Sequence, residues 1–306
     1  MTQARANRNL LLVAFMWGTS YTFIKMAIAG NMPPSVINGL RGLISAILVY
    51  IFFHNVVNDM TLEELKLGSI AGLLNFVVVQ LQSTGLEFTT SSNSSFITAT
   101  YVIFLPFITW IFFGKAPPRK IYLSIVICMV GMLFLTRIVS NGFELHIGDT
   151  LTILTAIVFA GQLAYYSFAM KKVRPQNIAF LLGAAQAVFA LFYSFTIDLH
   201  KLPQINWQQS IVPVIILGVV ATFAAQTLQV YSQKYTDTVT AGLILMTESL
   251  FASVISVIFG LEPLTRQLII GGTLIIIATL IAQFDLRGII TRYVVTQKRV
   301  HFKKLK

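Results

Sequence analysis

The stretch Ile111-Phe112-Phe113-Gly114 pairs with Val257-Ile258-Phe259-Gly260 when the sequence is shifted by 146 positions. The same shift needs no gap over residues 72–117. It also superposes glycine, polar and proline residues: Gly72 on Gly218, Gln80 on Gln226, Thr90 on Thr236 and Pro117 on Pro263. Apolar matches alone would carry little weight, but these matches coincide with the ends of apolar segments. The sequence therefore predicts two structural repeats, at about residues 8–140 and 148–286.

Composition places both repeats in a membrane. Of the 306 residues, 56% are apolar and 11% are charged, and the mean hydropathy is +0.78. A soluble domain carries about a quarter charged residues. A bilayer core of about 30 Å needs roughly 20 apolar residues per helical crossing, and runs of that kind take up nearly the whole chain. We therefore expect an all-α membrane protein in which residues 1–290 form a single transmembrane domain.

Apolar segments bounded by charged residues, Gly or Pro predict ten membrane crossings. They are residues 9–29, 35–54, 67–86, 93–113, 119–137, 149–170, 176–197, 210–231, 238–259 and 266–285. The first run is interpreted as a retained helix, because no small-residue cleavage site is evident near its end. Five helices per repeat is an odd number. The second repeat is therefore expected to enter the membrane from the opposite side, as inverted repeats do.

Lys and Arg residues set the expected orientation. With both termini in the cytoplasm, Arg137, Lys201 and Arg266 fall in outer loops, Lys25 and Arg41 lie within helices, and the other basic residues face the cytoplasm. We therefore expect a multi-pass protein of the cytoplasmic (cell) membrane. The basic tail at residues 291–306 is typical of contact with anionic lipid, which we favour over nucleic-acid binding.

Several motifs resemble the drug/metabolite transporter superfamily, EamA type, over about residues 8–285. They are Trp17-Gly18 through Lys25, Leu40-Arg41-Gly42, Thr247-Glu248-Ser249, and Gly260-Leu261-Glu262-Pro263-Leu264-Thr265. The resemblance implies ten helices and export, or less often import, of small metabolites such as amino acids or amines. Lys115 stands where the family usually has Glu, and Ser249 replaces the Pro that commonly follows Glu248. Without that Pro the ninth helix should be straighter, whereas Pro106 should kink the fourth.

Three charged residues, Lys25, Arg41 and Glu248, lie away from the ends of the predicted crossings, where each costs about 2.5–3.5 kcal/mol on insertion scales. Glu248 lies close to the middle of its segment. It is interpreted as a proton-coupling carboxylate or a counter-charge for a cationic substrate. The alternative is a fixed partner of Arg41, Lys25 or helix-end amides. Arg41 and Lys25 lie nearer the outer end and could grip a substrate carboxylate, but a structural or gating ion pair is the favoured interpretation.

Polar side chains within apolar helices indicate a water-filled or ligand-filled interior. The candidate substrate-binding residues are Trp17, Tyr21, Asn75, Gln80, Tyr101, Gln162, Tyr166 and Gln226. Trp17 and Tyr21 share one helix face at i, i+4 spacing, and the four aromatic residues could form a wall around an amine. Ordinary packing is the alternative. Gln80 and Gln226 are equivalent in the two repeats and are the favoured pair, with interhelical hydrogen bonding as the alternative.

These features favour transport over other functions. Inverted repeats are a recurring transporter architecture that supports alternating access, so a secondary transporter is expected, with export favoured. His-Glu-x-x-His, Gly-x-Ser-x-Gly and Walker motifs are absent, and one cysteine with scattered histidines offers no metal site. We expect neither enzyme activity nor a cofactor. A facilitator or importer of a small cationic or neutral solute stays open, as does, less favourably, a channel. A monomer and a homodimer through Gly271-Gly272 are both possible.

Overall fold

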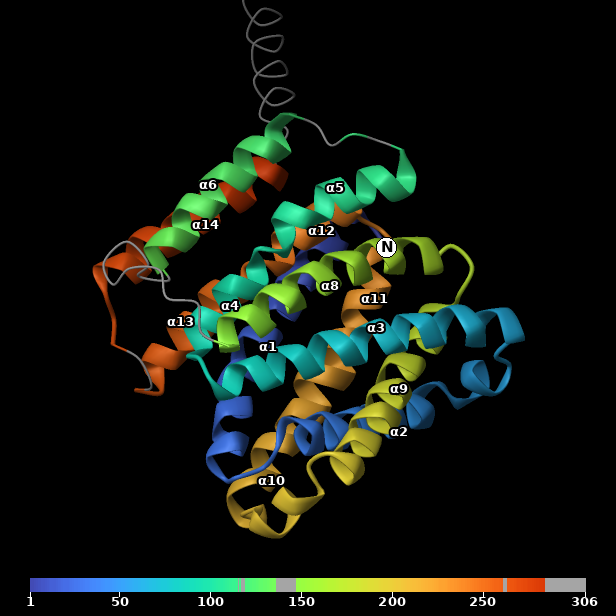
Figure 1. The fold of residues 1–306 in the computed structure, drawn as a ribbon. Helices are drawn as coiled ribbons and strands as arrows, with labels where there is room; N and C mark the ends of the chain where they lie inside the picture. Colours follow the sequence, from blue (N-terminus) through green and yellow to red (C-terminus); the bar gives the residue numbers. More distant parts are fainter. Residues whose placement is uncertain (115, 117–118, 136–146, 261–262, 284–306) are drawn as a thin grey trace, which may run out of the picture.

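The computed structural model describes residues 1–114, 116, 119–135, 147–260 and 263–283. All regular structure in that part of the chain is helical (Figure 1), which confirms the all-α prediction there. The elements are α1 (Gln3–Ala29), α2 (Pro34–Asn58), α3 (Leu62–Glu87), α4 (Ser91–Ala99), α5 (Tyr101–Phe113), α6 (Arg119–Leu135), α8 (Ile147–Ala169), α9 (Pro175–Thr196), the short 3-10 helix η1 (Leu199–Gln204), α10 (Trp207–Ile216), the π-helix η2 (Leu217–Ala224), α11 (Ala225–Gln233), α12 (Thr238–Leu245), α13 (Glu248–Ile258) and α14 (Arg266–Gln283).

Seven helical runs of the described chain are long and apolar enough to cross a membrane. They are Gln3–Ala29, Pro34–Asn58, Ser91–Phe113, Ile147–Ala169, Pro175–Thr196, Trp207–Gln233 and Thr238–Ile258. Helices α3, α6 and α14 lie at the other predicted positions. Ten crossings therefore stay a prediction. The basic tail at 291–306 lies outside the described residues.

Local sequence signals explain where several helices begin. Thr61 caps α3 by accepting a hydrogen bond from the backbone of Glu64, whose carboxylate accepts one from the Thr61 backbone in return. Pro34 and Pro175 begin α2 and α9, where a missing N–H costs nothing. Arg174, just before α9, donates to both carboxylate oxygens of Glu64 at 2.8 and 2.7 Å. This bidentate pair ties the start of α3 to the start of α9.

Two of the predicted crossings are interrupted in the middle. One breaks at Thr100, between α4 and α5, and α5 then continues through Pro106. A kink at Pro106 itself stays a prediction. The other breaks after Leu245 and resumes at Glu248, so the expectation of a straighter ninth helix is wrong. At each break a Thr hydroxyl donates to the carbonyl three residues back: Thr100 to Ile97 at 2.6 Å and Thr247 to Ile244 at 2.7 Å. Such side-chain bonds compete with the helical ladder and bend it.

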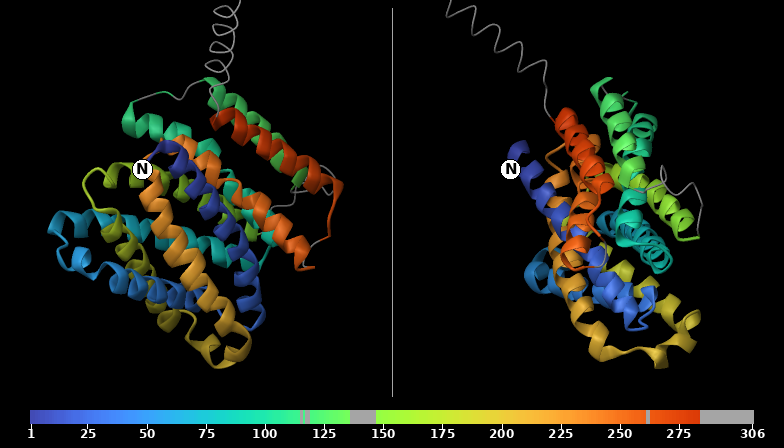
Figure 2. Two further views of the ribbon diagram at one scale, coloured as in Figure 1. Left: turned by 180° about the vertical axis from the view of Figure 1, so that it is seen from behind. Right: turned by 90° about the vertical axis from the view of Figure 1, so that its left-hand side faces the viewer.

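Helix packing looks the same when the two halves of the chain are exchanged. Helix α2 packs on α9, and α6 packs on α14, so each of these pairs joins equivalent helices of the two halves. The contact of α3 with α8 has its counterpart in the contact of α11 with α1. Figure 2 shows α10, η2 and α11 running beside α1. Gly114 follows α5, and Gly260 lies just after α13, 146 positions later in the sequence. Both have left-handed φ values, 68° and 69°. This correspondence is the packing expected of two structural repeats.

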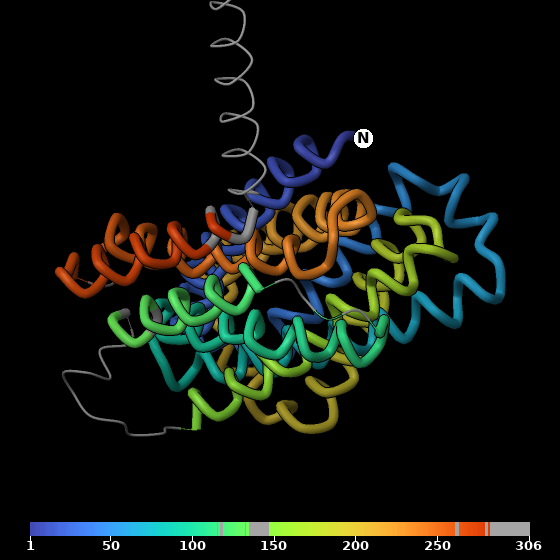
Figure 3. Tube along the Cα trace, turned by 90° about the horizontal axis from the view of Figure 1, so that it is seen from above, coloured from blue at the N-terminus to red at the C-terminus, as the bar shows by residue number. Residues whose placement is uncertain are grey.

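Glycines lie where helix backbones approach each other closely. A Cβ at Gly42 of α2 would lie 2.9 Å from the carbonyl oxygen of Gly183 in α9. At the other end of the molecule (Figure 3), a Cβ at Gly131 of α6 would lie 2.9 Å from the carbonyl oxygen of Gly271 in α14. The Gly271 backbone is thus used for packing within one chain, and a homodimer through that face stays a prediction.

Candidate functional site

A small cavity of about 40 Å³ lies among α1, α2, α3, α8, α11 and α13. Its lining is contributed by both halves of the chain and combines aromatic, charged and amide side chains: Trp17, Ser20, Tyr21, Arg41, Val78, Val79, Gln82, Phe159, Gln226 and Glu248. A cavity needs roughly 10–15 Å³ to hold a water molecule, so this one is large enough for ordered water. Buried polar groups of both signs around one cavity make it the candidate substrate site.

Glu248 enters this cavity from the break in the ninth predicted crossing. It is 3% exposed and is the first residue of α13, so its carboxylate lies at the positive end of that helix dipole. The Tyr21 hydroxyl donates to Glu248 Oε1 at 3.5 Å, and the hydroxyl itself accepts a hydrogen bond from Gln82 Nε2 at 2.8 Å. The chain Gln82–Tyr21–Glu248 therefore joins α3, α1 and α13 across the cavity.

Arg41 enters the cavity from α2. It is 4% exposed, and its Nε donates to Thr222 Oγ1 at 2.8 Å. The Thr222 hydroxyl in turn donates to the Leu217 carbonyl oxygen at 2.9 Å, inside the π-helix η2. Within the described residues, Arg41 Nη1 has no hydrogen-bond partner and Arg41 makes no ion pair with Glu248. The fixed Arg41–Glu248 pair weighed from the sequence is therefore not formed.

Lys25 is half-buried on α1 and is not among the residues that line the cavity. The structure places it near Glu87, which follows the predicted third crossing. Burial raises the pKa of the Glu87 carboxyl, and the positive charges of Lys201 and Lys25 partly oppose that rise. Lys25 thus belongs to the charged groups at the end of the bundle, away from Arg41 and Glu248.

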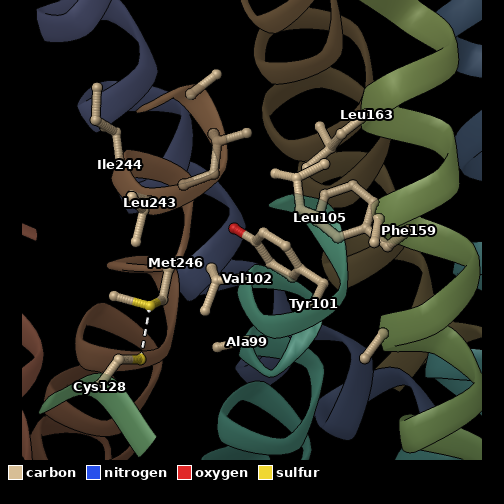
Figure 4. Packing of buried hydrophobic residues seen from close by; sticks show 14 of the residues in the cluster. Ala99, Tyr101, Val102, Leu105, Cys128, Phe159, Leu163, Leu243, Ile244 and Met246 are labelled. Carbon is tan, nitrogen blue, oxygen red and sulfur yellow. Dashed lines mark hydrogen bonds between the residues drawn. The ribbon is translucent and has the colours of Figure 1, made fainter. Parts of the chain in front are cut away.

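The predicted aromatic wall forms in part. Trp17 and Tyr21 both line the cavity, and Trp17 Nε1 donates to the Ala221 carbonyl oxygen at 3.0 Å. Phe159 of α8 completes this wall, with ring centroids 6.0 Å from Trp17 and 4.7 Å from Tyr101. Tyr101 lies behind Phe159 in an apolar core (Figure 4), and its hydroxyl donates to the Gly242 carbonyl oxygen. Tyr101 therefore supports the wall without lining the cavity.

Buried amides form a network behind the cavity. Asn75 Oδ1 accepts hydrogen bonds from Gln162 Nε2 at 3.3 Å and from Gln226 Nε2 at 3.1 Å, while Asn75 Nδ2 donates to Gln186 Oε1 at 3.0 Å. Gln162 also bonds the Tyr166 hydroxyl. Of these residues Gln226 reaches the cavity, and its Oε1 has no partner in the described part of the chain. Asn75, Gln162 and Tyr166 hold Gln226 in place.

Gln80 and Gln226, the pair favoured from the sequence, are not brought together. Gln80 Oε1 accepts a hydrogen bond from Asn38 of α2 at 3.0 Å, and Gln80 Nε2 donates to Thr84 at 3.3 Å. Gln80 thus makes the interhelical hydrogen bond that was weighed as the alternative. Its side chain faces α2, on a different side of α3 from the cavity.

Comparison with known proteins agrees with this architecture. The model of the EamA-like transporter family matches the chain twice, at residues 7–137 and 146–283. The chain belongs to the EamA-like transporter family. A relative described as an "Uncharacterized transporter", from Archaeoglobus fulgidus, is 30% identical over 276 residues, which covers 90% of this chain and 85% of the relative. A solved structure described as "Crystal structure of protein" is 14% identical, covers 94% of this chain and 99% of its own, and superposes with a TM-score of 0.74. That structure is evidence for the fold alone.

For this member of the EamA-like family, sequence reasoning missed Ser20, Val78, Val79, Gln82 and Phe159 among the lining residues. The same signal was available for all five. Asn75, Val78, Val79 and Gln82 recur at i, i+3, i+4 and i+7, which places them on one face of α3. Asn75 was already a candidate, so its helical neighbours could have been included. Ser20 stands three residues after the candidate Trp17, and Phe159 stands three residues before the candidate Gln162, so helical spacing could have included them too.

Proposed function

We propose that this EamA-like protein is a secondary transporter that moves a small metabolite, such as an amino acid or an amine, by alternating access. The observation that supports the proposal is one cavity lined by both halves of the chain, with Arg41 and Glu248 buried in it. Charged groups within apolar helices are costly and mark solute or ion pathways. Transporters built from repeats bind their solute at the repeat interface. Family membership favours transport over enzyme activity, and export is the direction that we favour.

The interrupted helices give alternating access a physical basis. Each break leaves backbone groups outside the helical ladder, which is tolerated in a membrane where they line a cavity or are buried in protein. The break before Glu248 also places a lining residue directly after an interruption of the helix. The ten crossings, the inverted orientation of the two repeats, the cytoplasmic termini in the cell membrane and the lipid contact of the basic tail belong to the same proposal. The two family matches and the exchangeable helix packing support the repeats.

Glu248 is proposed as the coupling group. A carboxylate that changes its protonation as the cavity opens to one side or the other can exchange a proton for a solute. Its single hydrogen bond within the described residues comes from Tyr21 and is long, at 3.5 Å, so the carboxylate is not locked into a fixed ion pair. A structural role for Glu248 would make the protein a facilitator instead.

Proteoliposome transport tests the proposal. Labelled amino acids and amines are assayed for uptake and counterflow, with and without an imposed proton gradient. We expect one or more solutes to accumulate with the gradient. Glu248→Gln should abolish gradient-driven accumulation while retaining exchange at saturating solute. Glu63→Gln is the matched control, because Glu63 is exposed and pairs with Lys172 on the surface.

Each other result has a defined meaning. If Glu248→Gln accumulates solute as the unmodified protein does, coupling through Glu248 is refuted and the facilitator alternative replaces it. Accumulation that runs inward under the physiological gradient identifies an importer. If no solute in the panel moves, the metabolite-transporter proposal itself fails.

A further inference from the structure

Three glutamines follow one face of α11, from the cavity toward the end of the molecule that holds the N-terminus (Figure 2). Gln226 lines the cavity, and Gln229 and Gln233 follow it at i+3 and i+7, which places all three on one side of the helix. Their exposures are 3%, 1% and 2%. Polar side chains buried within apolar helices mark water-filled or solute-filled routes, so this amide row calls for a role beyond packing.

The π-helix η2 decides which way the amide row points. Gln80 is the equivalent of Gln226 under the shift of 146 positions, yet Gln80 bonds α2 and Gln226 reaches the cavity. Helix α3 is a continuous α-helix, whereas α11 is entered through the eight residues of η2. A π-helix takes more residues per turn than an α-helix, so it rotates every side chain that follows. The rotation accounts for the different directions of two equivalent glutamines.

Hydrogen bonds from the amide row to α8 close this side of the bundle. Gln233 Nε2 donates to the Leu163 carbonyl oxygen at 2.9 Å and to Ser167 Oγ at 3.4 Å. Gln229 Nε2 donates to Gln233 Oε1 at 3.4 Å. The Ser167 hydroxyl also bonds the Thr238 hydroxyl, at the start of α12, at 2.5 Å. A set of bonds between neutral groups therefore joins α8, α11 and α12.

These bonds can open at low cost. Helix α11 carries no charged residue, so separating it from α8 breaks no ion pair between these two helices. Thr236, in the connection after α11, donates to Asn7 Oδ1 of α1 at 3.0 Å, which is again a bond between neutral groups. The net stabilisation from a neutral hydrogen bond is small, because its groups bond water when they separate. Water that enters between α8 and α11 would satisfy the amides that it exposes.

The cavity face of α3 offers no such route toward the opposite end. Beyond Gln82, the next residues on that face are Gly85 and Leu86. A Cβ at Gly85 would lie 2.9 Å from the Gly148 carbonyl oxygen of α8, and Leu86 is fully buried. Close backbone contact and an apolar side chain therefore seal that direction. The amide row on α11 is the polar direction away from the cavity.

We infer that Gln229 and Gln233 line the half of the solute path between the cavity and the end of the molecule that holds the N-terminus, and that their hydrogen bonds to each other and to α8 close it in this structure. Assigning the path to a solute rests on the proposed function. Neutral amides suit this role, because they both donate and accept hydrogen bonds without holding a charge. A charged solute passes them without meeting a fixed counter-charge.

Reaction with a water-soluble thiol reagent tests the path. Gln229→Cys and Gln233→Cys are made singly in a Cys128→Ala background, which removes the one native cysteine. A negatively charged methanethiosulfonate, which does not cross the bilayer, is applied to both sides of reconstituted membranes. Ser83→Cys is the matched control, because Ser83 is the equivalent of Gln229 in α3 and is 0% exposed. Since buried thiols are inert, the two α11 variants should react at least about tenfold faster than the control.

Transport measurements show whether the path carries solute. The reacted Gln233→Cys protein should lose most of its counterflow of the panel solutes, and reduction of the mixed disulfide should restore it. Gln233→Met, which removes the bonds to Leu163 and Ser167, should change the maximal counterflow rate several-fold. Its half-saturating solute concentration should stay within about twofold of the unmodified value, because the cavity is intact. A change in that concentration alone would indicate a structural effect on the cavity and contradict gating.

Failure of this inference and failure of the proposed function give different results. If neither α11 variant reacts faster than Ser83→Cys while panel solutes are transported, the path along α11 is overturned and the transporter proposal stands. If both react quickly but counterflow is unchanged, the amide row is a wet pocket outside the path and the inference is wrong. If they react quickly and no panel solute moves, the water-accessible row is supported and the metabolite-transporter proposal fails. Either α11 variant decides the test if the other does not fold.

Discussion

A methyl group added at Gly42 tests the contact on which the α2–α9 pair depends. A Cβ at this position would lie 2.7 Å from the Ala187 backbone nitrogen, 2.9 Å from the Gly183 carbonyl oxygen and 3.1 Å from the Gln186 carbonyl carbon. All three atoms belong to the backbone of α9, so no side chain can rotate away to make room. To restore an ordinary contact of 3.4 Å, the two helices must separate by roughly 0.7 Å.

The size of the effect follows from two opposing terms. Overpacking against a rigid neighbour costs about 1–3 kcal/mol, and the absence of a yielding side chain places Gly42→Ala near the upper limit. Replacing Gly by Ala within a helix recovers about 1 kcal/mol of helix propensity. The expected net loss is about 2 kcal/mol, or a midpoint lower by roughly 3 °C for a chain of this size.

Gly161→Ala is the matched control, because a Cβ at Gly161 in α8 would meet no atom within 4 Å. This substitution should gain only the helix propensity of Ala over Gly, about 1 kcal/mol, and its unfolding midpoint should rise by about 1–2 °C. Both variants are measured by thermal unfolding in the same detergent. The reasoning is refuted if Gly42→Ala unfolds at or above the midpoint of the unmodified protein. It is equally refuted if Gly161→Ala is destabilised as much as Gly42→Ala.

Three further predictions concern other parts of the structure. The hydrogen bond from the Arg174 guanidinium lowers the pKa of Glu64, which precedes the predicted third crossing, from 4.5 to about 2. Because the folded pKa is depressed, this pair stabilises the protein above about pH 4.5 and loses its effect as pH falls toward 2. Glu64→Gln should lower the free energy of unfolding by about 1–2 kcal/mol at neutral pH, after allowance for solvent screening. It should also weaken the dependence of stability on pH between about 4.5 and 2. An unchanged acid-unfolding profile would contradict this assignment. Thr222→Val removes the anchor of Arg41 and should raise, several-fold, the half-saturating concentration of the transported solute in counterflow, while Thr222→Ser should keep it near that of the unmodified protein; equal effects of Val and Ser would indicate a packing role instead. Gly260→Ala places a side chain at a φ of 69° and should lower stability by about 1–2 kcal/mol in thermal unfolding; an unchanged midpoint would show that the left-handed turn does not need Gly.

Much of the helical framework could be read from the sequence because it depends on local composition. A helix in lipid must satisfy its own backbone groups and expose apolar side chains, so long apolar runs mark helices whatever they pack against. The repeat was likewise visible as a shift of the sequence by 146 positions. Arg41 and Glu248 were recognisable as special, since a charge within an apolar run needs an internal partner or a solvated cavity.

The partners of those charges were decided by tertiary structure. The sequence offered Arg41 and Glu248 as a pair, but the π-helix η2 brings Thr222 to Arg41, and the break after Leu245 brings Glu248 to Tyr21. Both the eight-residue π-helix and the break are local departures from regular helix geometry. They arise from competition between nearly equal hydrogen-bonding alternatives, so a pattern of residue types does not reveal which one is chosen.

Helix rotation decided the rest of the site. Gln80 and Gln82 are near neighbours of similar character on α3, yet Gln80 bonds α2 while Gln82 reaches the cavity. Phe159 lines the cavity and Tyr101 stands behind it. The sequence by itself determined that polar and aromatic groups lie within the helical bundle. Which of them meet was set by close approaches such as Gly42 against Gly183, because the rotation of each helix is fixed by contacts between residues far apart in the chain.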